Sequence, residues 1–143
     1  MAKTNELYAY FTIAGEFNPN EISVRLGVQP TQSWAKGDAH PSNGLERKFS
    51  RWSLYSRLER NYPFEEHIRD VVRQLRSKTV EFKSVSQEFG GTLEVVGYFY
   101  SGYPGLSLER EDVAALAEFS LSVDFDYYYM YSDRREDTGD IAR

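Results

Sequence analysis

Polar and apolar residues alternate along four stretches of the chain, as they do in a β-strand whose two faces meet different surroundings. In the first stretch, Leu7, Phe11 and Ile13 fall on one side, whereas Tyr8 and Tyr10 fall on the other. Each such strand is expected to turn its apolar side toward a core. The pattern predicts strands over residues 6–14, 51–58, 92–100 and 119–128, and a shorter one over residues 31–36.

Apolar residues recur every three or four positions in three further segments, which is the spacing of an α-helix. The clearest helix start is at Asn18, whose side chain can cap the helix, with Pro19 in the first helical position. Gly27 is placed to end that helix. The predicted helices cover residues 19–26, 64–77 and 108–118.

The predicted elements follow one another in the order β-α-β-β-α-β-α-β. The first six match the split βαβ arrangement of ferredoxin-like folds, and an extra helix and strand follow. We therefore expect an α+β fold, a two-layer sandwich in which helices cover one face of a mainly antiparallel sheet. Residues 1–131 form a single domain in this interpretation, and residues 132–143 form a polar C-terminal tail. The stretches at residues 38–50 and 79–91 are interpreted as loops.

The composition is that of a globular domain with an excess of tyrosine. The 143 residues include 11 Tyr, 9 Phe and 2 Trp, and 41% of them are apolar. Cysteine is absent, which excludes a disulfide scaffold, cysteine catalysis and thiolate metal sites. The first residues lack the apolar run of a signal peptide, and no stretch approaches the ~18 apolar residues of a membrane-spanning helix. These observations predict a cytoplasmic protein without a membrane partner.

The charge is unevenly distributed along the chain. There are 17 basic and 22 acidic residues, which give a formal net charge of −5. Residues 46–78 carry nine Lys or Arg and five Asp or Glu, whereas residues 109–143 carry four Arg and ten Asp or Glu. A protein that binds duplex nucleic acid presents a concentrated basic face, so this acidic chain is not expected to bind it.

The least ordinary feature of the sequence is the position of its tyrosines. In several predicted strands they occupy the side opposite the apolar residues, so helices on the apolar side would leave them on an open sheet face. Tyrosine is common in protein interfaces because it joins an apolar ring to a polar tip. Alternatively, the loops at residues 38–50 and 79–91 cover this face. The candidate binding residues are Tyr8, Tyr10, Tyr98, Tyr100, Asp124, Asp126 and Tyr128.

We interpret this face as the binding surface of a non-enzymatic protein-interaction domain. The partner would be a second copy of the chain or a basic protein, such as a nucleic-acid-cleaving toxin. Single-stranded RNA is a third hypothesis, because exposed aromatic side chains on a sheet can stack bases. The acidic residues Glu94, Asp124 and Asp126 repel phosphate, which favours a protein partner.

A different hypothesis places a small-ligand site or an active site at the end of the second predicted strand. Trp34 and Trp52 could form an aromatic wall, with Lys36 as the cation and Asp38 as the carboxylate. The simpler interpretation is that Asp38 hydrogen-bonds a turn and Lys36 is solvated. In that case both tryptophans pack in the core or at its edge.

The familiar catalytic motifs are absent from the sequence. It contains no Gly-x-x-x-x-Gly-Lys-Ser/Thr loop, no Gly-x-Gly-x-x-Gly, no Gly-x-Ser-x-Gly and no His-Glu-x-x-His. His40 and His67 lie far apart and are expected at the surface. A metal site at Asp124 and Asp126 would need further oxygen ligands, which the sequence does not place. We therefore predict no catalytic residue, no metal site and no cofactor, although enzymatic activity is left open.

Several short motifs occur in a characteristic order along the chain. They are Tyr8-Ala9-Tyr10-Phe11, Asn18-Pro19-Asn20-Glu21, Leu26-Gly27-Val28, Pro30-Thr31, Trp34-Ala35-Lys36-Gly37-Asp38, Trp52-Ser53-Leu54 and Val123-Asp124-Phe125-Asp126-Tyr127. In this order and spacing, over residues 6–128, the chain resembles the bacterial family called domain of unknown function 4279. The resemblance implies a stand-alone bacterial protein, with no assigned activity, cofactor or catalytic residue. Small bacterial domains of this kind often lie beside toxin genes as immunity proteins, and that role is an expectation from the resemblance alone.

Overall fold

The computed structural model describes residues 3–130 of the chain. The tail predicted at residues 132–143 lies outside the described residues. No helix within residues 3–130 combines the length and the apolar character needed to cross a lipid bilayer. The elements are β1 (Glu6–Gly15), α1 (Pro19–Leu26), β2 (Gln32–Trp34), β3 (Ser50–Tyr55), α2 (Phe64–Leu75), the 3-10 turn η1 (Arg76–Lys78), α3 (Thr79–Phe89), β4 (Thr92–Phe99), α4 (Arg110–Glu118) and β5 (Ser122–Tyr129).

The strands form one mixed sheet in the order β2-β3-β1-β4-β5. The pairs β2–β3, β1–β3 and β1–β4 are antiparallel, which is the split βαβ arrangement that the order of elements predicts. The last strand, β5, joins the edge of the sheet parallel to β4, and α4 forms the crossover between them. The ferredoxin-like core with an added helix and strand is therefore confirmed.

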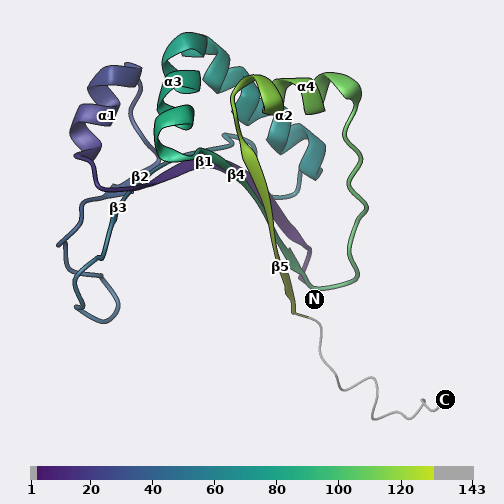
Figure 1. Cartoon of the computed structure of the whole chain (residues 1–143). Coiled ribbons are helices and arrows are strands. Elements are labelled where there is room, and N and C mark those ends of the chain that lie inside the picture. Colours follow the sequence, from purple (N-terminus) through teal and green to yellow (C-terminus); the bar gives the residue numbers. More distant parts are fainter. Residues whose placement is uncertain (1–2, 131–143) are drawn as a thin grey trace.

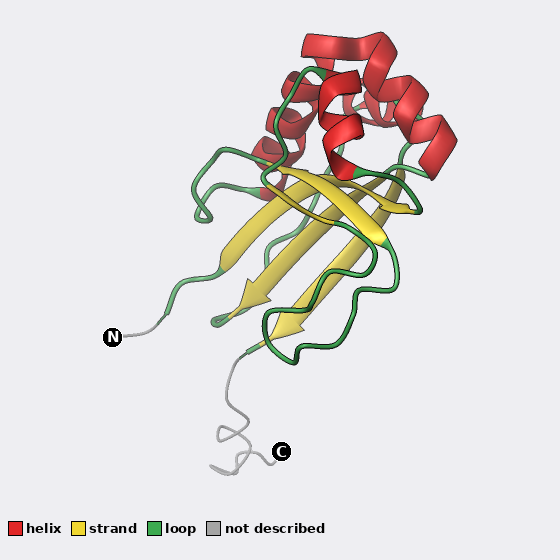
Figure 2. Cartoon of the chain, turned by 90° about the vertical axis from the view of Figure 1, so that its left-hand side faces the viewer, coloured by secondary structure: helices red, strands yellow, loops and turns green. Residues whose placement is uncertain are grey.

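The helices within residues 3–130 all lie on one face of the sheet. Figure 1 shows α1, α3, α2 and α4 above the strands, and Figure 2 shows the same two layers from the side. No helix of the described chain lies on the other face, which is called the open face below. This arrangement is the expected α+β two-layer sandwich.

The helix α1 begins and ends where its sequence predicts. The Asn18 side chain accepts a hydrogen bond from the backbone N–H of Asn20 at 2.9 Å, which caps the first turn. Gly27 ends the helix with a φ of 68°, a left-handed conformation that favours glycine.

The segment from residue 79 to 89 is the helix α3, so the interpretation of 79–91 as a loop is wrong. Phe82 and Val85 lie one turn apart on α3 and are fully buried in the core. Gly90 closes the helix with a φ of 71°. Because α2, η1 and α3 follow each other directly, they form one helical segment between β3 and β4, and the predicted order of elements is retained.

The core lies between the helices and the sheet, and Trp52 is its largest fully buried side chain. Its ring centroid lies 6.2 Å from those of Phe11 on β1 and Phe82 on α3, so three elements meet at this point. The indole Nε1 donates a hydrogen bond to Ser23 Oγ on α1 at 3.0 Å, which satisfies the buried N–H. Trp52 thus ties β3 to two helices.

His67, expected at the surface, is instead completely buried on α2. Its Nδ1 lies 2.8 Å from Ser56 Oγ, and its ring packs edge-on against Tyr62. The cause is the connection between β3 and α2, residues 56–63, which folds back over this side of the helix. Burial lowers the pKa of His67 below its usual value, because it disfavours the charged ring.

Candidate functional site

The register of the strands determines which side chains share the open face. Partners directly opposite in neighbouring strands point to the same side of a sheet. Tyr10 of β1 pairs with Tyr55 of β3 and with Glu94 of β4. Glu94 in turn pairs with Asp124 of β5, so one row of side chains crosses four strands of the open face.

Tyrosines form two stacked groups on this face. The rings of Tyr10 and Tyr55 stack with centroids 4.3 Å apart, and Tyr8 stacks on Tyr55 at 5.8 Å. Farther along the sheet, Tyr98 of β4 stacks on Tyr128 of β5 at 4.7 Å. All but Tyr128, which is 41% exposed, are half-buried. Stacked rings of this kind make a firm apolar surface with polar oxygens at its edge.

The structure brings together six of the seven candidate binding residues. Tyr100 is the exception, because β4 ends at Phe99 and Tyr100 lies in the loop that follows. Its half-buried ring lies near Lys3, with Nζ 4.9 Å from the ring centroid. The six that share the open face are Tyr8, Tyr10, Tyr98, Asp124, Asp126 and Tyr128.

The predicted loops do not cover these tyrosines. Residues 79–89 belong to the helical layer, and residues 38–49 extend from the β2–β3 end of the sheet on the side away from the helices (Figure 1). Tyr8 and Tyr10 contact each other, Tyr55 and Tyr98 and the cation Arg60, and Tyr10 also lies beside Glu94 and Arg51. The open face is therefore available along β1, β4 and β5.

Tyr55 and Glu94 complete the site but were not among the candidate binding residues. Alternation alone places Tyr55 opposite Trp52 and Leu54, and this was a usable indication. What alternation does not give is the strand order, which puts β3 next to β1 and Tyr55 beside Tyr10. Alternation within one strand shows which face a residue lies on. Which residue lies beside it on that face depends on which strands pair.

Glu94, Asp124 and Asp126 form an acidic group on the open face. Burial, together with the neighbouring Asp124 carboxylate, raises the pKa of Glu94 to about 7. A proton on Glu94 can be shared with Asp124, to which it is hydrogen-bonded. On the other side, the Tyr128 hydroxyl donates to Asp126 Oδ2 at 2.9 Å, and this bond raises the pKa of Tyr128. Glu94 thus gains or loses its proton near neutral pH.

The open face also has a cationic margin. The guanidinium of Arg60 lies 4.1 Å from the Tyr8 ring centroid and pairs with Glu6 at 3.2 Å. Arg51 of β3 donates to Thr12 Oγ1 at 2.9 Å. Burial is the main reason that the pKa of Tyr8 is raised to about 12, so its hydroxyl stays neutral at physiological pH. The centre of the face thus presents neutral phenols between acidic and basic sides.

Replacing Glu94 by glutamine is expected to change how stability depends on pH. The pKa of Glu94 is about 7 in the folded chain against an ordinary value of 4.5, so the folded state binds this proton more tightly. Wild-type stability should therefore fall as the pH rises from about 4.5 to above 7. Glu94→Gln has no such titration, so its unfolding free energy relative to wild type should rise by on the order of 1 kcal/mol across that window, after discounting for solvent screening.

Urea unfolding at several pH values measures this effect. Glu21→Gln, the same change in the first turn of α1, is the matched control in the helical layer. A Glu94→Gln difference that stays constant between pH 4.5 and 8 would show that the Glu94 proton is not held by the fold.

The four residues of the alternative pocket do not converge. Trp34 pairs with Arg51 and therefore lies on the open-face side, whereas Trp52 pairs with Ser33 and points into the core. Lys36 Nζ pairs with Glu16 at 2.9 Å. Asp38 Oδ2 accepts a hydrogen bond from the Ala35 N–H at 2.9 Å, as the simpler turn interpretation expects. Because Trp34 lies opposite Arg51, one residue away from Trp52, the two tryptophan side chains lie on opposite faces of the sheet.

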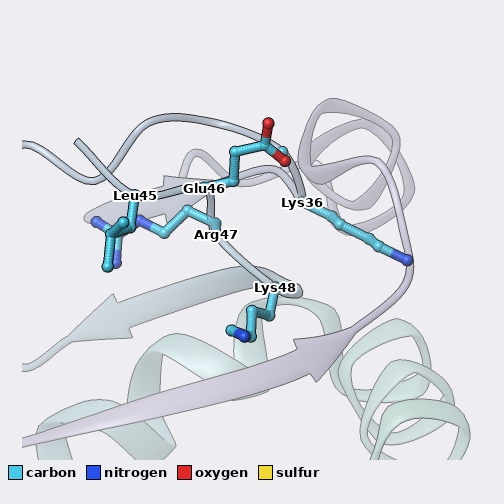
Figure 3. A pocket seen from close by; sticks show the side chains of 6 residues that line it. Lys36, Leu45, Glu46, Arg47 and Lys48 are labelled. Atoms are coloured by element: carbon cyan, nitrogen blue, oxygen red, sulfur yellow. The ribbon is translucent and has the colours of Figure 1, made fainter.

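A hollow beside Lys36 lies in the loop between β2 and β3. It has a volume of about 750 Å³ and is lined by residues 36–37 and 45–48. Figure 3 shows that the side chains of Lys36, Glu46 and Lys48 point in different directions rather than toward one centre. Arg47 stacks on the Trp34 ring at 3.7 Å and so braces the loop. This arrangement offers no convergent set of polar groups to a small ligand.

Comparison with known proteins places the chain among related sequences. The model of the family described as Domain of unknown function (DUF4279) matches residues 5–130, which include every strand and helix described above. The chain belongs to this family. The DUF4279 chain matches no curated protein and no solved structure. Its function must therefore be argued from its own surface.

Proposed function

We propose that this DUF4279 chain is a non-enzymatic protein-interaction domain that binds a basic partner protein on its open face. The observation that carries the proposal is a five-stranded sheet with helices on one face only, whose other face combines stacked tyrosines with an acidic group. The absence of cysteine is compatible with action in the cytoplasm.

The tyrosines are suited to contact with another protein. A stacked, half-buried tyrosine loses little side-chain freedom on binding and still offers an apolar ring and a hydroxyl. Tyr8, Tyr10 and Tyr55 form such a surface at the middle of the sheet. Aromatic residues of this kind dominate the binding energy of many protein interfaces.

The acidic group favours a cationic partner. Lysine or arginine placed between Glu94, Asp124 and Asp126 would find carboxylates that form no ion pair within residues 3–130, although Arg51 acts on Glu94 electrostatically. A cation there stabilises the ionised form of Glu94, so binding should release its proton and strengthen as the pH rises through about 7. Nucleic acid is disfavoured by the same charges.

A basic protein is favoured over a second copy of the chain. Two open faces placed together would bring their acidic groups close to each other, and like charges at an interface are repulsive. A basic protein such as a nucleic-acid-cleaving toxin has the complementary charge, and an immunity role in a bacterium would fit this pairing. The net charge of −5 would also speed the encounter with such a partner.

Charge reversal on the open face is the experiment that tests this proposal. Asp124→Lys, in the middle of the acidic group, is compared with Glu21→Lys on α1, which makes the same change of charge in the helical layer. Each purified variant is used to capture proteins from an extract of the source organism. A basic protein retained by wild type should be lost with Asp124→Lys and kept with Glu21→Lys, because the reversal weakens binding by about 30-fold or more.

The opposite pattern decides against the proposal. The open face is not the binding surface if Asp124→Lys retains the same proteins as the wild-type chain. The same holds if Glu21→Lys loses the partner and Asp124→Lys keeps it. Repeating the capture at high salt adds a second criterion, since a charge-dependent complex weakens as salt screens it.

A further inference from the structure

The strand β5 forms one edge of the sheet. β5 is the last strand of the sheet, and within residues 3–130 no strand pairs with its outer side. The backbone N–H of Ser122 donates to the Gly91 carbonyl, and that of Met130 donates to the Phe99 carbonyl. The even-numbered residues of β5 therefore point their backbone N–H and C=O groups toward β4. Because a strand alternates, Val123, Phe125 and Tyr127 turn their N–H and C=O groups outward.

Side chains along this edge follow the same alternation. Asp124 and Asp126 lie on the open face, next to Glu94. Phe125 and Tyr127 lie on the helix side, where they and residues 106 and 108 line an apolar hollow of about 580 Å³. Phe125 is 54% exposed. The stretch of this edge from Val123 to Tyr127, with its apolar side, is a template for another strand.

Resting on the proposed function, we infer that the partner docks by an extended segment that pairs with β5. Its alternate side chains are basic and apolar. The basic ones lie on the open face against Asp124 and Asp126, and the apolar ones cover Phe125 and fill the hollow beside it. The added strand extends the sheet by main-chain hydrogen bonds, and the alternation provides the specificity.

The same charges argue against a second copy as the added strand. Two β5 strands related by a two-fold axis would run antiparallel. Asp124 and Asp126 of one copy would then lie opposite or diagonal to residues of the same acidic set in the other. Like charges across a strand pair are destabilising, whereas a basic strand is attracted.

A short synthetic peptide that alternates arginine and valine is the probe. Its binding to the full chain is measured by titration calorimetry, and the contacted amides are mapped by NMR. The peptide should bind at least about tenfold more tightly than a peptide of the same composition with arginines and valines in separate blocks. The largest shifts should fall on Val123, Phe125 and Tyr127.

Backbone methylation of the probe tests the strand pairing without changing the protein. In a paired strand, alternate N–H groups point at the neighbour. One peptide is methylated at the backbone N–H of every arginine, and another at the backbone N–H of every valine. Their affinities should therefore differ, because one methylation should abolish binding and the other should spare it. Which one abolishes it also gives the direction of the strand. On the protein, Phe125→Ser should weaken binding about tenfold, whereas Val24→Ser, which replaces an exposed apolar residue on α1, should not.

Three results would overturn this inference. The first is equal binding of the alternating and block peptides, or no binding at millimolar concentration. The second is equal binding of both methylated peptides with shifts on Tyr8 and Tyr10, which would leave the open-face proposal standing without the edge. The third is a dimer of the chain alone with protected β5 amides, since a second copy would then occupy the edge.

Discussion

Trp52→Ala is expected to lower the free energy of unfolding by about 3–5 kcal/mol, the range for a fully buried large aromatic side chain. Trp52 is 0% exposed and packs on Phe11 and Phe82, so its removal leaves a cavity where β3, β1 and α3 meet. It also removes the hydrogen bond to the buried Ser23 Oγ. Urea unfolding followed by circular dichroism measures the loss.

Trp34→Ala is the matched control, because it removes the only other tryptophan. Trp34 lies on the open-face side and is partly exposed, with its Nε1 bonded to the Phe49 carbonyl at 3.1 Å. Its removal should cost less than about half as much as the removal of Trp52. Equal losses for the two variants would mean that the two tryptophans are not on opposite sides of the sheet.

Gly97→Val is the second large effect, and about 3 kcal/mol of stability should be lost through overpacking. Gly97 is buried in β4 on the helix side, where a Cβ atom would lie 2.5 Å from the Phe99 ring and 2.9 Å from the Phe64 ring. Both rings would have to move. They also contact Tyr127, so the shift would reach β5 and loosen its edge.

Gly105→Val separates this steric effect from a general cost of replacing glycine. No atom lies within 4 Å of a Cβ built at Gly105, so this variant should unfold within about 0.5 kcal/mol of wild type. If Gly97→Val is as stable as Gly105→Val, then Phe64 and Phe99 do not pack over the glycine as described. Hydrogen exchange of the β5 amides gives an independent measure of the loosening.

Local pattern was enough to predict the strands and their two faces. Alternation in β1 separates Leu7 and Phe11 from Tyr8 and Tyr10, and the structure keeps this division. The start and end of α1 were equally predictable, because Asn18 and Gly27 act through bonds to their immediate neighbours. Where one side of a strand is apolar and the other is polar, alternation alone determines which side faces the core.

Long-range packing explains two sequence predictions that were wrong, the loop at residues 79–91 and the exposure of His67. The helix α3 lacks a side-chain N-cap and follows η1 directly, so its start has no local mark, although Phe82 and Val85 need a helix to reach the core. His67 is buried by residues 56–63 that lie before it in the chain, not by its own helix. The helix α3 and the burial of His67 both depend on how distant segments pack, which the hydrophobic periodicity of one segment does not predict.

The candidate site shows the same limit. Alternation identified Tyr8, Tyr10 and Tyr98 as residues of one face. The grouping into stacks with Tyr55 and Tyr128, and the raised pKa of Glu94, require the strand order and register. The two tryptophans were considered together as the aromatic wall of a pocket, yet the register of β2 with β3 places them on opposite faces.

The open face, rather than the helical layer, is the surface expected to contact a partner, and site-specific photo-crosslinking measures this contact directly. The crosslinking amino acid p-benzoylphenylalanine replaces Tyr98 in one sample and Val80, which is 75% exposed on α3, in another. Each purified protein is irradiated in an extract of the source organism. We expect a single adduct with a basic protein from position 98 and none from position 80. Adducts of equal yield from both positions, or from position 80 alone, would contradict the assignment of the open face as the binding surface.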